Sequence, residues 1–136
     1  TTGDADAAAG KGHAPRRVIF LDIDGVLQPC SARARFDHPL HRLRHRLATD
    51  VDIRFALLDP WDMGAVVWDW NPAAVDFVRR LCTETGAQVV LSSSWRTGKS
   101  LAMLRLLFSL QSLGEVLADC TPSLAEGMWC YSGPPN

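Results

Sequence analysis

The segment at residues 18–27, VIFLDIDGVL, constrains the fold of this chain most, because an apolar run passes directly into two aspartates and a glycine. Residues 18–21 are β-forming and lack a polar break, which is typical of a strand buried in a parallel sheet. Asp22 and Asp24 follow where that strand should end, and Gly25 allows a turn or close backbone approach. Open α/β sheets place their chemistry at the carboxyl ends of their strands. The segment therefore predicts an α/β fold with a two-carboxylate site; an ordinary strand followed by an Asp-Gly turn is the alternative.

The spacing of the two aspartates has a direct chemical interpretation. One carboxylate can attack phosphorus and form an acyl-phosphate, and a second, two residues on, can protonate the leaving oxygen and then activate water. Mg²⁺ can hold the phosphate against the nucleophile and reduce the repulsion between anions. Segment 18–27 closely resembles the first motif of the haloacid dehalogenase-like (HAD) hydrolases, which are mostly Mg²⁺-dependent phosphatases. The resemblance implies that Asp22 is the nucleophile and Asp24 the general acid/base. It also implies that Mg²⁺ binds the Asp22 side chain and the Asp24 main-chain carbonyl.

The rest of the chain alternates between helical and strand patterns. Residues 71–86 predict a helix, with Asn71 as N-cap, Pro72 at the first helical position and Gly86 as the stop signal. Residues 87–91 predict a second buried strand, residues 99–113 a second helix and residues 115–118 a third strand. This order implies right-handed crossovers and a parallel sheet, which the resemblance places in a three-layer HAD-like, Rossmann-like domain.

A long segment, residues 28–70, separates the first strand from the first helix. Apolar residues alternate with more polar ones over 51–57, which predicts a half-buried strand. Residues 65–68 are the expected hairpin partner of that strand. HAD proteins carry a helical turn and a β-hairpin flap just after the first motif, and small caps are inserted there. We therefore expect residues 28–70 to form an enlarged flap or minimal cap.

The second strand ends in hydroxyl residues, as VVLSSSWR. A hydroxyl at the end of a neighbouring strand can donate a hydrogen bond to a transferring phosphoryl group. The segment resembles the second HAD motif, and most closely that of the small HAD-like subgroup associated with RNA-repair proteins. Ser92 or Ser93 is the expected phosphate ligand, and Ser94 the expected helix cap. Arg96 and Lys99 are further phosphate-binding candidates beside Gly25.

Residues 93–100 also resemble the end of a nucleotide-binding P-loop. That loop requires a glycine where this chain has Ser93. A phosphate ligand within a HAD-like site is therefore the favoured interpretation of these residues.

Residues 33–46 are locally basic. Five arginines fall in this segment, and Asp37 is its one acid: Arg33, Arg35, Arg42, Arg44 and Arg46. A polynucleotide end or a nucleotide is a candidate ligand, and a solvated helical face is the alternative. The histidines at positions 38, 41 and 45 have helical spacing and could bind Zn²⁺. The arginines around them oppose a metal site.

Composition excludes several functional classes. The chain has 136 residues, 47% hydrophobic content and a net charge of −1, which fits one globular domain and no bulk attraction to nucleic acid. No stretch approaches the roughly 20 apolar residues of a membrane span. The four scattered cysteines predict buried free thiols rather than a disulfide framework, and a cytoplasmic location. Residues 1–15 predict a disordered leader before a domain at 16–136.

The end of the chain departs from the HAD pattern. HAD hydrolases also need a later lysine and a later acidic motif, and residues 123–136 contain neither in the expected setting. Lys99, Asp119 and Glu126 are possible substitutes. We expect either a Mg²⁺-dependent phosphomonoester hydrolase or a truncated or divergent, catalytically silent relative. Its expected partner is a phosphorylated small molecule or a polynucleotide end, and the oligomeric state is not predicted.

Overall fold

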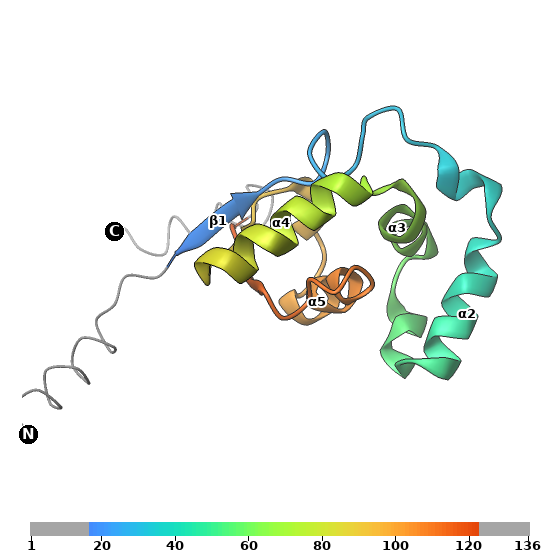
Figure 1. Cartoon of the computed structure of the whole chain (residues 1–136). Coiled ribbons are helices and arrows are strands. Elements are labelled where there is room, and N and C mark those ends of the chain that lie inside the picture. Colours follow the sequence, from blue (N-terminus) through green and yellow to red (C-terminus); the bar gives the residue numbers. More distant parts are fainter. Residues whose placement is uncertain (1–16, 123–136) are drawn as a thin grey trace, which may run out of the picture.

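The computed structural model describes residues 17–122 (Figure 1). The predicted leader at 1–15, and with it Glu126 and Cys130, lies outside these residues. A strand and the helical insertion come first: β1 (Val18–Leu21), η1 (Ala34–Asp37), α2 (Leu40–Asp50), η2 (Ile53–Leu57), α3 (Pro60–Gly64) and η3 (Ala65–Asp69). The remaining elements are α4 (Pro72–Thr85), β2 (Gln88–Leu91), η4 (Ser94–Arg96), α5 (Leu101–Ser109) and β3 (Leu117–Cys120).

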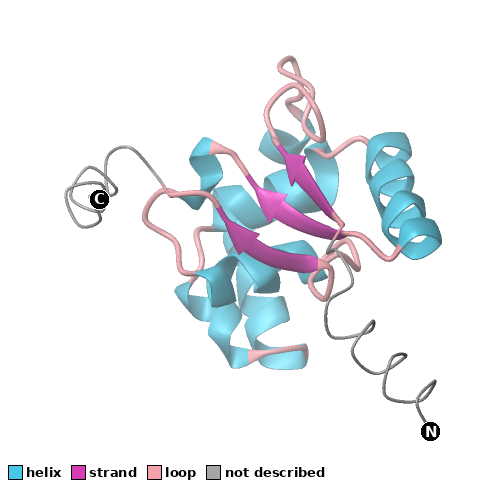
Figure 2. Ribbon diagram, turned by 90° about the vertical axis from the view of Figure 1, so that its left-hand side faces the viewer, coloured by secondary structure: helices cyan, strands magenta, loops and turns pink. Residues whose placement is uncertain are grey.

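The three strands form one parallel sheet in the order β1-β2-β3 (Figure 2). Leu21 pairs with Leu91, and Leu91 pairs with Cys120, so the strands end at the same level. The β3 strand ends two residues later than its pattern predicts. The α/β class and the strand–helix–strand order predicted from the sequence are confirmed.

The helix α4 begins and ends where its sequence signals predict. The Asn71 side chain accepts hydrogen bonds from the backbone N–H groups of Ala73 and Ala74, and Pro72 occupies the first turn. Gly86 ends the helix with a φ of 73°, a left-handed conformation that glycine adopts without steric cost. The helix α5 is shorter than predicted. It starts after Ser100, whose hydroxyl accepts from the Met103 N–H, and it ends at Ser109.

Both long helices of the sheet region, α4 and α5, contribute to one hydrophobic core. Val75 and Val78 of α4 and Leu104 and Leu107 of α5 are buried together with the β2 residue Leu91. Figure 2 looks onto the strands, with most of the helices behind them. Parallel strands that are adjacent in order and joined by right-handed crossovers are expected to carry their connecting helices on one face of the sheet.

The two edge strands, β1 and β3, differ in what they present to solvent. The guanidinium of Arg105 donates to the carbonyl oxygens of Leu117 (2.8 Å) and Ala118 (3.1 Å) in β3. The β1 side chains of Val18 and Phe20 are 44% and 68% exposed. Among the described residues, therefore, side-chain hydrogen bonds cover part of the β3 backbone, whereas β1 presents apolar side chains to solvent.

The insertion is helical, so the predicted hairpin of 51–57 and 65–68 is wrong. Residues 53–57 form a 3-10 helix, whose three-residue turn puts Phe55 and Leu58 on the same buried side. Val51, Ile53 and Leu57 are exposed, although their alternation predicted a half-buried strand. The Asp52 side chain accepts from the Arg54 N–H and starts this helix. Local capping therefore prevailed over the alternating pattern.

Ion pairs fasten the insertion to itself and to the sheet region. The fully buried Asp69 carboxylate pairs with the Arg35 guanidinium and also accepts from the Arg35 N–H (3.1 Å). Lys99 pairs with Asp62 of α3 at 3.1 Å. Because Lys99 lies in the β2–α5 loop, this ion pair connects the insertion directly to the sheet region.

No helix within residues 17–122 is long and apolar enough to cross a membrane. Cys30 and Cys82 carry free thiols, as predicted; Cys82 is buried, whereas Cys30 is exposed, so the expectation of a buried thiol is wrong for Cys30. Burial raises the pKa of the Cys82 thiol, which packs as a small apolar residue in the core.

Candidate active site

Three residues with oxygen-bearing side chains follow the three strands at one edge of the sheet. The Ser92 N–H donates to the Leu21 carbonyl oxygen at 2.7 Å, and the Thr121 N–H donates to the Leu91 carbonyl oxygen at 2.8 Å. These bonds continue the strand register by one residue, so that Asp22, Ser92 and Thr121 follow one another across the edge. Thr121 was not among the predicted site residues; the signal for it was its place directly after the last strand.

Asp22 and Asp24 are exposed, and buried residues flank them in the chain. Leu21 and Ile23 belong to the core, so the aspartates occupy the alternate, solvent-facing positions. Asp22 Oδ1 accepts a hydrogen bond from the Ile23 N–H at 2.7 Å. Within residues 17–122, Asp24 makes no side-chain hydrogen bond, and neither carboxylate forms an ion pair with Lys or Arg. Two carboxylates without a cationic partner therefore occupy the end of β1.

A tight turn holds the aspartates in place. The Ile23 carbonyl oxygen accepts from the N–H groups of Val26, Leu27 and Gln28, at 2.9 to 3.1 Å. Gly25 has a φ of 79°, and its N–H donates to the Gln28 carbonyl oxygen at 2.8 Å. The Leu27 carbonyl oxygen accepts from the Asn71 N–H at 2.6 Å. The turn after the aspartates is therefore bonded to the first residue before α4.

The serines of the second strand have different environments. Ser92 is exposed and follows β2 directly, beside the end of β1. Ser93 is 3% exposed, and its hydroxyl accepts from the Trp95 N–H at 3.3 Å. Ser93 is thus the N-cap of η4, and the expectation that Ser94 is the helix cap is wrong. The Ser92 hydroxyl is the more accessible of the two candidate phosphate ligands.

The two predicted cationic ligands make contacts of their own. The Arg96 guanidinium donates to the carbonyl oxygens of Ser93 and Pro122, the second at 3.2 Å, and so joins the segments that follow β2 and β3. Lys99 Nζ donates to the Trp95 carbonyl oxygen at 3.1 Å besides its ion pair with Asp62. Asp119 lies inside β3, and its Oδ1 accepts from the Cys120 N–H at 2.8 Å. Roles for Arg96 and Lys99 in phosphate binding stay predictions.

The oxygen atoms at the end of β1 are of the type that Mg²⁺ prefers as ligands. This ion takes hard oxygen ligands and usually keeps several waters, so that one or two protein ligands plus substrate phosphate are a common set. The Asp22 carboxylate and the Asp24 carbonyl oxygen would be those ligands. Among the described residues no group of three or more His, Cys, Asp or Glu side chains gathers into a fuller metal site. The three histidines of the insertion are not such a group: His38 stacks on Trp68, with ring centroids 3.8 Å apart.

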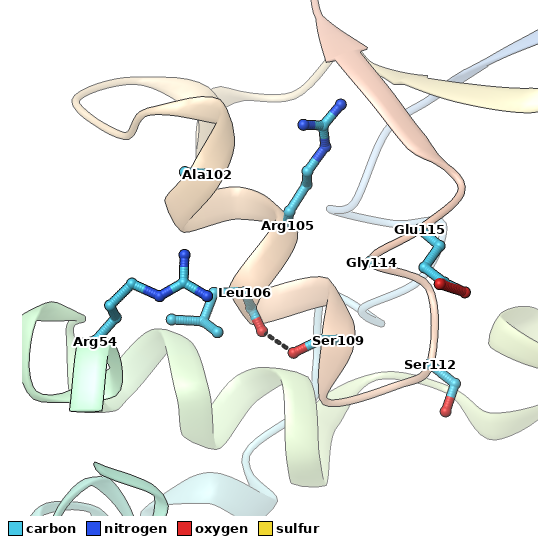
Figure 3. Close-up of a pocket in the computed structure, with 8 residues that line it drawn as sticks. All are labelled: Arg54, Ala102, Arg105, Leu106, Ser109, Ser112, Gly114 and Glu115. Atoms are coloured by element: carbon cyan, nitrogen blue, oxygen red, sulfur yellow. Dashed lines mark hydrogen bonds between the residues drawn. The ribbon is translucent and has the colours of Figure 1, made fainter. Parts of the chain in front are cut away.

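One open groove within residues 17–122 lies away from the aspartates. It has a volume of about 800 Å³ and an open shape, between η2 and the end of α5 (Figure 3). Its lining includes Ser109, Gly114 and Glu115, which precede β3. Asp22 follows the carboxyl ends of the strands, so the groove is at the opposite edge of the sheet. Arg105 points from this groove toward β3, where strand carbonyls bind its guanidinium.

A comparison with models of known protein families identifies the family of this chain. Residues 18–130 match the model of the HAD domain in Swiss Army Knife RNA repair proteins. The chain belongs to this family. The match includes both aspartates, the serine loop and the whole helical insertion. No curated protein and no solved structure matches the chain well enough to add a relative. The predicted resemblance to HAD hydrolases and to their RNA-repair subgroup is confirmed.

Proposed function

We propose that this protein is a phosphomonoester hydrolase that works through an aspartyl-phosphate on Asp22. One observation carries the proposal: at the end of a parallel strand in a HAD domain, two exposed carboxylates lie two residues apart and have no cationic partner among residues 17–122. The adjacent Ser92 hydroxyl supports it, because it stands at the end of the neighbouring strand.

The proposed reaction uses the two aspartates in sequence. The Asp22 carboxylate attacks phosphorus, and the ester oxygen leaves with the proton of Asp24. Asp24 then accepts a proton from water, which attacks the aspartyl-phosphate and releases inorganic phosphate. The Ser92 hydroxyl donates to a phosphoryl oxygen in both steps. Asp24 suits both roles, because it is solvent-exposed and has no side-chain hydrogen bond to the described residues.

We include Mg²⁺ in the proposal as the cofactor, held by Asp22 and by the Asp24 carbonyl. When bound, it neutralises charge on the phosphate and the nucleophile. Mg²⁺ would supply a larger share of the positive charge than usual, since no Lys or Arg within residues 17–122 pairs with either aspartate. Lys99 as a replacement for the family lysine would first have to leave Asp62.

The proposed substrate class is inferred from the insertion and from the family. Residues 28–70 would act as a minimal cap next to the turn that carries the aspartates. The substrate would be a phosphorylated small molecule or a polynucleotide end, the latter favoured by the RNA-repair family. The free thiols of Cys30 and Cys82 support a reducing, cytoplasmic environment.

Phosphate release from p-nitrophenyl phosphate with Mg²⁺ tests the proposal. We expect Asp22→Asn to reduce turnover to background, and Asp24→Asn to reduce it about 10²- to 10⁴-fold, the usual contribution of general acid–base catalysis. Asp76→Asn, an equal change at an exposed position on α4, should leave turnover unchanged. Wild-type turnover in Asp22→Asn would contradict the assignment.

A catalytically silent phosphate-binding protein is the second candidate function. The observation that favours it is the ion pair of Lys99 with Asp62, which leaves Asp22 and Asp24 without a lysine partner in the described part of the chain. This alternative predicts no phosphate release by the wild-type protein at any Mg²⁺ concentration, together with binding of inorganic phosphate that Ser92→Ala weakens. Measurable turnover that depends on Asp22 excludes it.

A further inference from the structure

The helix α2 has one buried face and one basic, exposed face. Leu40 and Leu43 are buried, and Arg44, Leu47 and Ala48 are partly buried beside them. The exposed positions carry His41, Arg42, His45, Arg46, Thr49 and Asp50. In Figure 1, α2 forms the right-hand flank of the molecule, on the far side of α3 from the sheet region. The net charge of the whole chain is only −1, so this concentration of cations is local.

The exposed cations of α2 have no ionic partners in the described part of the chain. Arg42 and Arg46 make no ion pair and no side-chain hydrogen bond there. Arg44 differs, because it donates to the Leu58 carbonyl oxygen at 3.3 Å. The arginines of α4 differ as well: Arg79 approaches Asp76, and Arg80 approaches Glu84. The cations of α2 therefore remain available to an anionic ligand.

The charge pattern of α2 opposes helix formation. Its N-cap, Pro39, makes no side-chain capping bond, and no acidic residue lies in the first turn. Arg42 stands near the positive end of the helix dipole, and Arg42 and Arg46 are like charges four residues apart. Each effect costs a few tenths of a kcal/mol. A helix that only had to cover the core would be more stable with acidic residues at these positions.

An aromatic stack with one exposed ring, His38, and one partly buried ring, Trp68, lies next to the start of the helix. The His38 ring is parallel to the Trp68 ring, with an interplanar angle of 3° and a centroid separation of 3.8 Å. His38 is exposed, two residues before α2 begins. Stacked rings of this kind can extend their stack to a nucleic acid base.

We propose that the exposed face of α2, together with the His38–Trp68 stack, binds a single-stranded polynucleotide. Arg42 and Arg46 contact successive phosphates, and the stack receives a base. The inference rests on the proposed function, since it identifies the substrate as a polynucleotide with a terminal phosphate. It assigns substrate recognition to the insertion rather than to the strand ends.

Salt-dependent binding provides the test. The probe is a fluorescein-labelled 12-nucleotide RNA, titrated with full-length Asp22→Asn protein so that no turnover occurs. Each phosphate contact to a single strand contributes about −0.7 to the slope of log K against log salt concentration. We expect Arg46→Gln to reduce the slope by about 0.7, and Arg42→Gln combined with Arg46→Gln to reduce it by about 1.4. Arg80→Gln on α4, an equal change of charge at an exposed arginine, should leave the slope unchanged.

A second ligand and a further variant separate the possible sources of binding. A poly-glutamate peptide of equal charge should bind more weakly, and His38→Ala should lower RNA affinity about 5-fold or more, as the loss of a stacking contact predicts. Equal slopes for Arg46→Gln and Arg80→Gln, or equal binding of poly-glutamate, would overturn the inference.

Turnover distinguishes this inference from the proposed function. The Arg42→Gln, Arg46→Gln variant should hydrolyse p-nitrophenyl phosphate at the wild-type rate but show a raised KM for a phosphorylated RNA. If the wild-type protein shows no turnover but the arginine substitutions reduce the salt slope of RNA binding as predicted, the hydrolase is refuted and the binding surface stands. If the wild-type protein turns over substrate but the arginine variant keeps the same salt slope as the Asp22→Asn protein without arginine substitutions, only the surface is refuted.

Discussion

The sheet region and the helical insertion differ in how far local sequence signals support their helices, as a comparison of α4 with α2 shows. In α4, Asn71 caps the start, Gly86 ends the helix, and arginines lie near acidic residues of the same helix. In α2, no side chain caps the start, and the exposed arginines are unpaired in the described part of the chain. Local signals agree with tertiary packing in α4, whereas α2 depends on its buried face. A segment whose local signals conflict with its structure is where a function is expected to lie.

Despite this difference, the two regions share one core. Phe55 of the insertion belongs to the same buried cluster as Leu91 of β2 and Leu107 of α5. The comparison therefore predicts one cooperative unit with two kinds of surface, not two independent units.

The largest expected effect concerns that shared core. Phe55→Ala should lower the free energy of unfolding by about 3–5 kcal/mol, because it removes a large, fully buried side chain and leaves a cavity. Urea denaturation followed by circular dichroism should still show a single transition. Leu57→Ala is the matched control, since Leu57 is 77% exposed and its loss should change stability little. Two separate transitions would contradict the single cooperative unit and show that the insertion unfolds independently.

A smaller effect should follow from the cap of α4. Asn71→Ala removes the acceptor for the Ala73 and Ala74 N–H groups and should cost about 1 kcal/mol. Asn71→Ser keeps an acceptor and should remain near the wild-type stability in the same denaturation experiment. A loss with Ser as large as that with Ala would show that the side-chain cap is not what stabilises α4.

The smallest effect is a pH dependence within the insertion. Hydrogen bonds from Arg54 lower the pKa of Asp52 from 3.8 to about 2. A carboxylate with a lowered pKa in the folded state favours folding above its unfolded pKa, and that contribution disappears as the pH falls from about 4 to about 2. A carboxyl NMR titration should find the low pKa in the wild type and a higher pKa in Arg54→Ala, which loses the side-chain hydrogen bonds to Asp52 but keeps the one from the backbone N–H of residue 54. An unchanged pKa in that variant would exclude Arg54 as the cause.

Agreement between sequence and structure was best where one local rule sufficed. The turn at Gly25 and both ends of α4 follow from residue type and spacing. The insertion could not be predicted in this way. The alternation over 51–57 fits a strand, but the Asp52 cap and the packing of Phe55 and Leu58 select a 3-10 helix. The contacts of Arg96 and Lys99 were also beyond local reasoning, since each joins segments distant in the chain.

The sequence by itself determined the family, the parallel strand–helix order and the aspartates at the end of the first strand, because each depends on adjacent residues and their period. Tertiary structure decided which hydroxyl is accessible. The strand register leaves Ser92 exposed beside Asp22, whereas Ser93 is buried as the cap of η4. It also decided that Lys99 pairs with Asp62 and that Arg42 and Arg46 of α2 face solvent, whereas Arg44 is partly buried. Packing between distant segments sets these outcomes, and residue spacing alone does not encode them.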